Sequence, residues 1–427
     1  MKARSLSLFV VAISIVSSSA SAADWAQWRG PKRDGVSQEK GLADEWPQAG
    51  PKLLWQVKSI GDGYGAPAVV GGRIYLIGNN GMENEVVQAL NPTNGQQIWQ
   101  RRLGKVGNPD QEPPYPAARS TPTVDGNLLY AFGSDGDLAC LDAGTGAVRW
   151  QKNVRQEFGG KPGVWAYAES PLVDGNVVVC SPGGPDATIV ALNKTTGDVI
   201  WKGQVPEGDE AGYASAIVVD AGGKKQYVQF LGKGVVGVDA ATGSFLWRYN
   251  ATGGGPANIA TPVAQDGNVY TPSQAGSGLV RLSPNGGVIE AQQVYLTRGL
   301  PNSIGGSVLI DGHLYGTTRV ANTFTGLVCA DFKTGEVKWK DPSIGVGAVC
   351  SADGLLFVHS ENGEVALVEA TPTAYREKGR ITLPEKPQHA SQQEKSWAYP
   401  VVANGRLYIR DKNVLWCYGI ADTASPN

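Results

Sequence analysis

Polar and aromatic residues that could bind a ligand recur beside short segments in which a small residue or a tyrosine precedes proline. Such segments stand at Ala66-Pro67, Thr121-Pro122, Ser170-Pro171, Thr261-Pro262 and Tyr399-Pro400. Aromatic, amide and charged groups that converge on one hollow suit a small polar ligand or a peptide. The candidate site residues are Tyr64, Arg119, Tyr167, Glu169, Tyr213, Asn258, Asn302 and Trp397.

The charged candidates also have a purely structural interpretation. Arg119 and Glu169 could pair with each other or with backbone groups instead of contacting a ligand. The acidic loop 203–213, GQVPEGDEAGY, could edge the same site, or it could be a solvated loop. The residue types alone leave these alternatives open.

Other reactive side chains do not form a familiar catalytic motif. The three histidines, His313, His359 and His389, are far apart and build no HExxH, and there is no GxSxG or P-loop. The glycine-rich stretches 253–255 and 61–65 are not followed by a helical pattern, so they are not phosphate cradles. Structural roles are expected for His313 and His359.

A sequence motif that ends in tryptophan recurs along the chain, and it predicts the strands that would hold the candidate site residues in position. In five copies, glycine stands four residues before the tryptophan, and Asp or Asn stands eight before it. Successive tryptophans are 51, 51, 46 and 92 residues apart, so one unit, 260–287, has lost its tryptophan. Another unit without it is 347–372. The pairs are Gly95 and Trp99, Gly146 and Trp150, Gly197 and Trp201, Gly243 and Trp247, and Gly335 and Trp339.

Each unit reads as four short strands joined by tight turns. The Asp or Asn can bond its own backbone two residues on, and the glycine supplies the positive φ of a tight turn. The tryptophan then falls on the outermost strand, where its ring can dock against the next unit. Four strands at a period of about 45 residues are the plan of one propeller blade.

The ends of the chain predict how the ring closes. The last unit, 398–420, contains only three strands, while segment 51–58 carries Trp55 one period before Trp99. If 51–58 completes the last blade, no sheet edge is left open by the chain ends. The fold class predicted is all-β: an eight-bladed β-propeller of four-stranded antiparallel blades, with the last blade closed by an N-terminal strand.

The segments outside the repeat suggest export. Residues 1–22 have a basic start, an apolar run over 6–16 and an Ala20-Ser21-Ala22 cleavage site, as in a signal peptide. Residues 23–50 are expected to be an extended lead packed across the propeller, or a partner-binding arm. The propeller spans 51–420, and 421–427 is a tail. A periplasmic or secreted location follows, without a lipid-anchor cysteine or a transmembrane segment in the mature chain.

Composition narrows the class of partner. The net charge is −2 and no long basic run occurs, which argues against nucleic acid. The five cysteines are an odd number without a CxxC spacing, so at least one thiol is unpaired. Most lie in apolar strand-like runs, as buried thiols would, and a disulfide between neighbouring strands is the alternative.

At these motifs the sequence resembles the PQQ-like β-propeller repeat family. The A-x-D-x-x-T-G-x-x-x-W phrase is similar to the tryptophan-docking repeats of quinoprotein dehydrogenases and of the non-catalytic, eight-bladed, BamB-like propellers. The lead DWAQWRGPKRDGVS, residues 24–37, resembles the start of planctomycete-type exported PQQ-repeat proteins. The resemblance covers nearly all of 51–420.

The resemblance implies two functions. Quinoprotein dehydrogenases hold PQQ with Ca²⁺ and usually carry a disulfide between adjacent cysteines beside the quinone. This chain has no adjacent cysteines and lacks the large loop insertions of those enzymes, so the sequence favours a non-catalytic propeller. Such a module would bind an envelope protein or a small polar ligand at the channel mouth. The alternative is a PQQ-dependent alcohol or sugar oxidoreductase.

Overall fold

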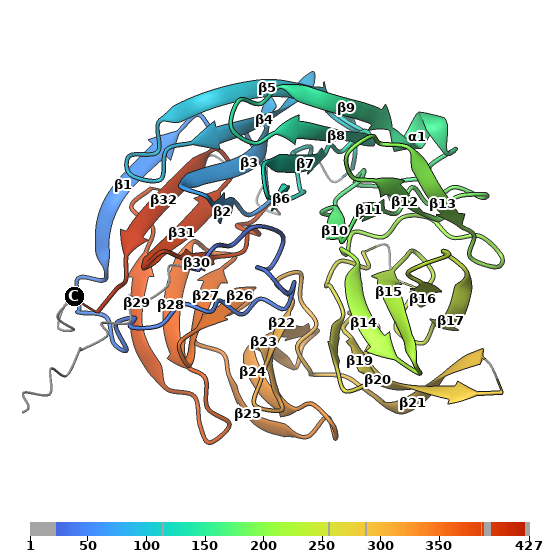
Figure 1. The fold of residues 1–427 in the computed structure, drawn as a ribbon. Helices are drawn as coiled ribbons and strands as arrows, with labels where there is room; N and C mark the ends of the chain where they lie inside the picture. The colour runs from blue at the N-terminus through green and yellow to red at the C-terminus, as the bar shows by residue number, and fades with distance from the viewer. Residues whose placement is uncertain are drawn as a thin grey trace, which may run out of the picture.

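The structure, a computed structural model, describes residues 23–112, 115–254, 257–286, 288–385, 387 and 394–422. Across this part of the chain, eight four-stranded sheets with antiparallel pairing stand around one axis (Figure 1). The predicted eight-bladed propeller is confirmed. The expected signal peptide, 1–22, residues 423–427 of the expected tail, and His389 lie outside the described residues.

The first four blades follow the chain in order. Blade 1 contains β2 (Ala68–Val70), β3 (Arg73–Asn80), β4 (Asn84–Leu90) and β5 (Gln97–Lys105). Blade 2 contains β6 (Thr123–Asp125), β7 (Leu128–Phe132), β8 (Asp137–Asp142) and β9 (Val148–Asn153), and the short helix α1 (Val154–Glu157) follows it. Blade 3 contains β10 (Leu172–Asp174), β11 (Val177–Cys180), β12 (Ile189–Asn193) and β13 (Val199–Gly203). Blade 4 contains β14 (Ile217–Ala221), β15 (Lys224–Phe230), β16 (Val235–Asp239) and β17 (Phe245–Tyr249).

The second four blades complete the ring. Blade 5 contains β18 (Val263–Gln265), β19 (Asn268–Thr271), β20 (Ser277–Asn285) and β21 (Val288–Thr297). Blade 6 contains β22 (Ser307–Ile310), β23 (His313–Val320), β24 (Phe324–Asp331) and β25 (Val337–Asp341). Blade 7 contains β26 (Gly347–Ala352), β27 (Leu355–Ser360), β28 (Glu364–Glu369) and β29 (Glu377–Thr382). Blade 8 contains β30 (Val401–Ala403), β31 (Arg406–Asp411), β32 (Val414–Gly419) and the N-terminal strand β1 (Lys52–Lys58).

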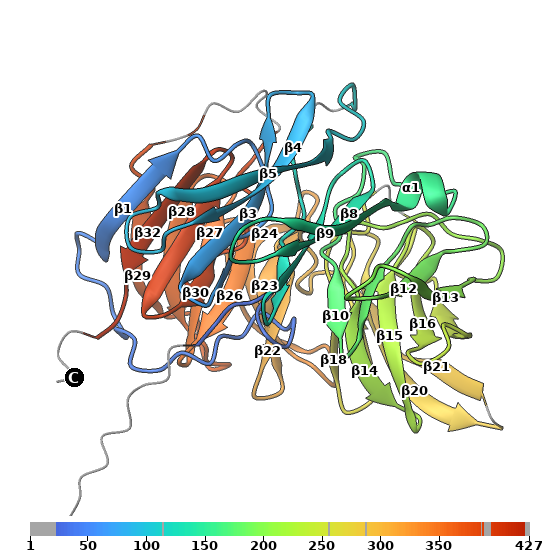
Figure 2. The same cartoon turned by 45° about the horizontal axis from the view of Figure 1, so that its top comes forward.

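Strand β1 closes the ring as the sequence predicted. It pairs antiparallel with β32, so that Trp55 lies opposite Cys417 and Lys58 lies opposite Val414. In Figure 2 the blue strand β1 lies beside the red strand β32. This pairing joins two segments from opposite ends of the chain, because β1 covers the edge of β32 that would otherwise be open.

The repeated phrase is the joint between blades. The Trp99 indole N–H of blade 1 donates to the Ala143 carbonyl of blade 2 at 3.1 Å. A Cβ at Gly146, whose φ is +70°, would lie 2.6 Å from Cε3 of Trp99, so only glycine fits both the turn and the ring. The same donation to the next blade recurs from Trp55 to Pro92 (2.9 Å), Trp150 to Lys194 (3.0 Å), Trp201 to Ala240 (3.2 Å) and Trp339 to Thr371 (2.7 Å).

The two blades that lack the tryptophan differ from the others at their outermost strands. In blade 5, the Tyr295 ring lies 3.3 Å from where a Cβ of Gly335 would be, and its hydroxyl donates to Phe332 O. In blade 7, Trp46 of the lead bonds β29 through its backbone N–H, which donates to Lys378 O at 2.8 Å. Trp247 differs from the other tryptophans, because blade 5 lacks the phrase that would receive it. Its indole donates within its own blade, to Gln226 Oε1.

The five cysteines are free thiols and all are buried in strands. The inter-strand disulfide considered from the sequence is therefore not formed, and the buried-thiol interpretation holds. Burial raises the pKa of the Cys140 and Cys329 thiols to about 11. Among the described residues, no helix is long and apolar enough to cross a membrane.

Candidate functional site

The first part of the lead, residues 23–37, lies at the centre of the ring and contacts all eight blades (the dark-blue segment in Figure 1), whereas the later part reaches the outer strand β29 at Trp46. Arg33 joins blades 3 and 4, because its guanidinium donates to the carbonyls of Ser170 (2.9 Å), Pro171 (3.2 Å) and Ala216 (2.8 Å). The lead reaches the other blades through hydrogen bonds between Trp25 and Val69, Ala26 and Val124, Trp28 and Thr261, Arg29 and Ser307, Ser37 and Ser351, and Ser37 and Val402. The lead therefore fills the propeller channel at the level of the innermost strands.

Two buried ionisable groups, Arg33 of the lead and Glu169, influence each other electrostatically. Arg33 is only 3% exposed, and its burial lowers the pKa of the guanidinium to about 9, against the opposing effect of Glu169. Burial raises the pKa of Glu169 to about 7, although the carboxylate accepts hydrogen bonds from the Ser181 backbone N–H and the Gln229 amide. Both side chains bond to interior groups and are not open to solvent.

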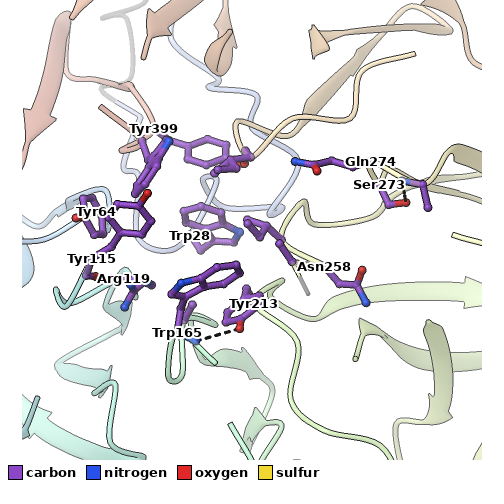
Figure 3. A pocket seen from close by; sticks show the side chains of 16 residues that line it. Trp28, Tyr64, Tyr115, Arg119, Trp165, Tyr213, Asn258, Ser273, Gln274 and Tyr399 are labelled. Carbon is purple, nitrogen blue, oxygen red and sulfur yellow. Dashed lines mark hydrogen bonds between the residues drawn. The ribbon is translucent and has the colours of Figure 1, made fainter. Parts of the chain in front are cut away.

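A pocket of about 320 Å³ lies where the chain enters the innermost strands, with Trp28 of the lead in its wall (Figure 3). The loops before the innermost strands supply most of its lining residues. Five of the eight predicted residues line this pocket: Tyr64, Arg119, Tyr213, Asn258 and Trp397. The sequence reasoning missed Trp28, Tyr115, Trp165, Ala168, Ala257, Ile259, Ser273, Gln274, Ala275, Ile304 and Tyr399.

Aromatic rings form the walls and hold one another in place. Trp28 meets Tyr399 edge to face with centroids 4.5 Å apart, and its indole N–H donates to Thr261 Oγ1. Trp165 lies 5.6 Å from Tyr213, whose hydroxyl accepts the Trp165 backbone N–H. Close aromatic pairs add about 0.5–1.5 kcal/mol each beyond burial, so the rings are preorganised.

Trp397 completes the wall on the side of blades 8 and 1. Its ring lies 5.1 Å from the rings of both Tyr64 and Tyr115. The Tyr64 hydroxyl donates to the buried Glu394 carboxylate, which also pairs with Lys412 at 3.2 Å. Burial, together with the Glu394 carboxylate, raises the pKa of Tyr64 well above its usual range. Tyr64 is thus a neutral hydrogen-bond donor at any physiological pH.

Arg119 is the one charged side chain among the described lining residues. Its guanidinium donates to Ala117 O at 3.0 Å, to Gln111 Oε1 at 2.9 Å and to Tyr115 O. It also lies over the Tyr64 ring, with Cζ 5.6 Å from the centroid. Arg119 therefore bonds to groups of its own chain segment and not to Glu169, which is one of the alternatives that the sequence left open.

Three predicted residues lie outside the pocket. Tyr167 is buried and donates to Pro182 O at 2.8 Å, Glu169 accepts hydrogen bonds from Ser181 N–H and the Gln229 amide, and Asn302 accepts from the Thr318 hydroxyl at 2.9 Å. Each side chain is at most 8% exposed. Neighbouring residues of an extended segment point to opposite sides. That a residue lies in one of these loops therefore does not show whether its side chain faces the pocket.

The acidic loop 203–213 borders a second, open groove of about 890 Å³ that shares Tyr213 and Asn258 with the pocket. Its Asp209 is not solvated, since it pairs with Arg248 at 2.9 Å and accepts the Lys233 backbone N–H at 2.9 Å. The loop therefore borders a groove beside the pocket, while its Glu207 and Glu210 are exposed to solvent, so each of its two sequence interpretations holds in part.

The remaining titratable groups do not assemble a metal site in the part of the chain that the structure describes, which holds no group of three or more His, Cys, Asp or Glu suited to a metal ion. His359 is buried in β27 with Nδ1 on Ala398 O, and burial lowers the pKa of its imidazole. His313 bonds Asp311 O at the start of β23.

Comparisons with known proteins match this architecture. A protein family described as "Outer membrane protein assembly factor BamB" matches residues 83–341 and again 257–374. Tetrathionate hydrolase from Acidithiobacillus ferrooxidans is 25% identical over 48% of this chain and 44% of its own. Outer membrane protein assembly factor BamB from Salmonella typhimurium is 28% identical over 38% of this chain and 41% of its own. The chain thus spans less than half the length of these two curated relatives.

Quinoproteins are also among the similar proteins. Quinoprotein alcohol dehydrogenase PedH from Pseudomonas putida is 29% identical over 32% of this chain and 22% of its own. Among solved structures, BamB from Moraxella catarrhalis has a TM-score of 0.61 at 15% identity and covers 88% of this chain and 99% of its own. A quinohemoprotein alcohol dehydrogenase from Pseudomonas putida has a TM-score of 0.64 at 15% identity, covering 95% and 81%. At these identities the structural likeness shows the fold alone.

Proposed function

The chain belongs to the family described as outer membrane protein assembly factor BamB, and from that premise we propose that it is a non-catalytic binding propeller of the cell envelope. The observation that carries the proposal is the aromatic pocket, which lies at the mouth of a channel filled by the lead. A hollow with fixed apolar walls and few polar groups is typical of binding sites. The pocket holds a small ligand, or a side chain of an envelope protein that docks on this face.

The envelope location rests on the relatives and on the sequence. The relatives named BamB are, by their name, assembly factors for outer membrane proteins. The apolar start of residues 1–22 adds an export signal. Both support a periplasmic or secreted protein.

A quinone-dependent oxidoreductase is the second candidate, favoured by the likeness to quinoproteins. PQQ carries three carboxylates, and its Ca²⁺ needs several oxygen ligands, including carboxylate. The described lining offers a single cation, Arg119, no Asp or Glu, and no cysteine pair. This donor set does not fit the quinone and its metal.

A ligand screen tests the binding function. The mature chain is melted alone and with sugars, short peptides or aromatic compounds, and hits are repeated with Trp165→Ala and with the control Val288→Ala, whose side chain is 62% exposed on β21. We expect at least one compound to raise Tm in the native chain and the control, but not in Trp165→Ala. Hits that persist in Trp165→Ala, or a screen without hits, would contradict a binding role for the pocket.

Reconstitution separates the two candidate functions. The native chain is incubated with micromolar PQQ and Ca²⁺, and the absorbance of the quinone and dye-linked oxidation of alcohols and sugars are followed. We expect neither a spectral shift nor oxidation. Stoichiometric binding of PQQ together with turnover of an alcohol or sugar would contradict the binding module and support the oxidoreductase.

A further inference from the structure

The walls of the pocket suit a flat, apolar guest. Its aromatic side chains are already fixed by edge and offset contacts with one another, at centroid distances between 4.5 and 5.6 Å. A guest ring therefore gains stacking and burial without the cost of ordering the walls. Sugars need several polar partners instead, and the Asn258 amide N–H groups are already used by Leu231 O (2.7 Å) and Gly232 O (2.8 Å).

The charge of the pocket selects the sign of the guest. Arg119 is held by three hydrogen bonds to its own loop, and a guanidinium has five N–H donors, so two N–H groups take no part in these bonds. A fixed cation among aromatic rings attracts an anion more strongly than it would in water. It also repels an ammonium group, although aromatic rings alone would attract one.

The size of the pocket sets the size of the guest. An apolar cavity of about 150 Å³ accommodates benzene. The pocket here is about 320 Å³, which is room for two fused rings with one small substituent. Since the lead fills the channel beyond Trp28, a longer rigid guest would have to extend outward, away from the lead.

We propose that the pocket binds a small aromatic carboxylate of about two fused rings, whose rings pack between Trp28, Trp165 and Trp397 and whose carboxylate pairs with Arg119. This assignment rests on the proposed binding function and names the ligand class of the same site. The carboxylate would accept the remaining guanidinium N–H groups in charge-assisted hydrogen bonds, which are shorter and stronger than neutral ones.

Calorimetric titration with matched probes tests the proposal. The probes are 2-naphthoate, the neutral 2-naphthylmethanol, the cationic 2-naphthylmethylammonium and glucose, each titrated into the full mature chain at pH 7. We expect 2-naphthoate to bind at least ten times more tightly than the alcohol, and the ammonium and glucose to bind more weakly still. Arg119→Gln should abolish the difference between acid and alcohol, whereas Val288→Ala should leave it unchanged.

A second variant protects the test against loss of structure, because Arg119 also holds its own loop. Arg119→Lys keeps the charge, so it should keep a preference for the acid even if both affinities fall. Equal affinity for acid and alcohol in the native chain, tighter binding of the ammonium or glucose, or no binding of 2-naphthoate would each overturn the proposal. If sugars or peptides instead give hits that Trp165→Ala removes, the binding function stands and only this ligand class fails.

Discussion

Glu85 makes the stability of the propeller depend on pH. It lies on β4, fully buried between blades 1 and 2, where it accepts the backbone N–H (2.8 Å) and the hydroxyl (2.5 Å) of Ser134. Burial raises the pKa of the Glu85 carboxyl from 4.5 to about 7. Between these two values the folded chain keeps a proton that the unfolded chain has released. The contribution of Glu85 to stability is therefore greatest below pH 4.5, and it is lost as pH rises through about 7.

The magnitude follows from the size of the pKa change. A rise from 4.5 to about 7 corresponds to a loss of about 3 kcal/mol at pH 8, and of under about 1 kcal/mol at pH 5. Glu85→Gln removes this loss, because glutamine is neutral and has the same shape. Its amide oxygen can accept the Ser134 N–H, while its amide N–H donates to the Ser134 hydroxyl.

Urea unfolding at pH 5, 6, 7 and 8 measures the effect. Glu85→Gln should be more stable than the native chain by about 3 kcal/mol at pH 8, and the two should converge toward pH 5. Glu83→Gln, on the same hairpin but exposed, is the control and should not reproduce the gain at pH 8. A gain of equal size at pH 5 and pH 8, or a loss at pH 8, would refute the reasoning.

Three further predictions concern the joints, the filled channel and the thiols. Gly146→Ala should lower the free energy of unfolding by about 3 kcal/mol in urea titrations, because the new Cβ would meet Trp99 and would also strain a positive φ. The control Gly126→Ala, with φ +59° and open space around it, should cost only about 1 kcal/mol, and equal costs for the two variants would rule out the docking contact. Arg33→Gln should lower the free energy of unfolding by about 3 kcal/mol in the same measurement, because three buried carbonyls lose their donor, whereas Lys32→Gln at the exposed neighbouring residue should leave it unchanged. If Arg33→Gln is as stable as the native chain, the lead does not stabilise the ring. The five cysteines should react with a thiol reagent only after unfolding, and reductant should leave Tm unchanged; fast labelling of the folded chain would contradict their burial.

The sequence alone determined the fold of this protein. The spacing of glycine before tryptophan identified the blade, and the period of this motif along the chain predicted the number of blades. The extra strand before the first unit, around Trp55, predicted the ring closure that the pairing of β1 with β32 shows. These features are local and repeated, because in each copy the same turn glycine packs against the same kind of aromatic ring. The architecture of a repeat protein can therefore be predicted without information on contacts between residues that are distant in the sequence.

Only the tertiary structure decided which residues make the pocket. Loop positions brought Tyr64, Arg119 and Trp397 into consideration, but the direction of each side chain depends on contacts with other blades. Glu169, for example, bonds Ser181 and Gln229 and does not line the pocket. We expected the lead to pack across the propeller, but it belongs to no repeat, so its sequence did not show which blades it would bond or that Trp28 would lie in the pocket wall. Those contacts join residues that are far apart in the sequence, and they form only when eight blades share one axis.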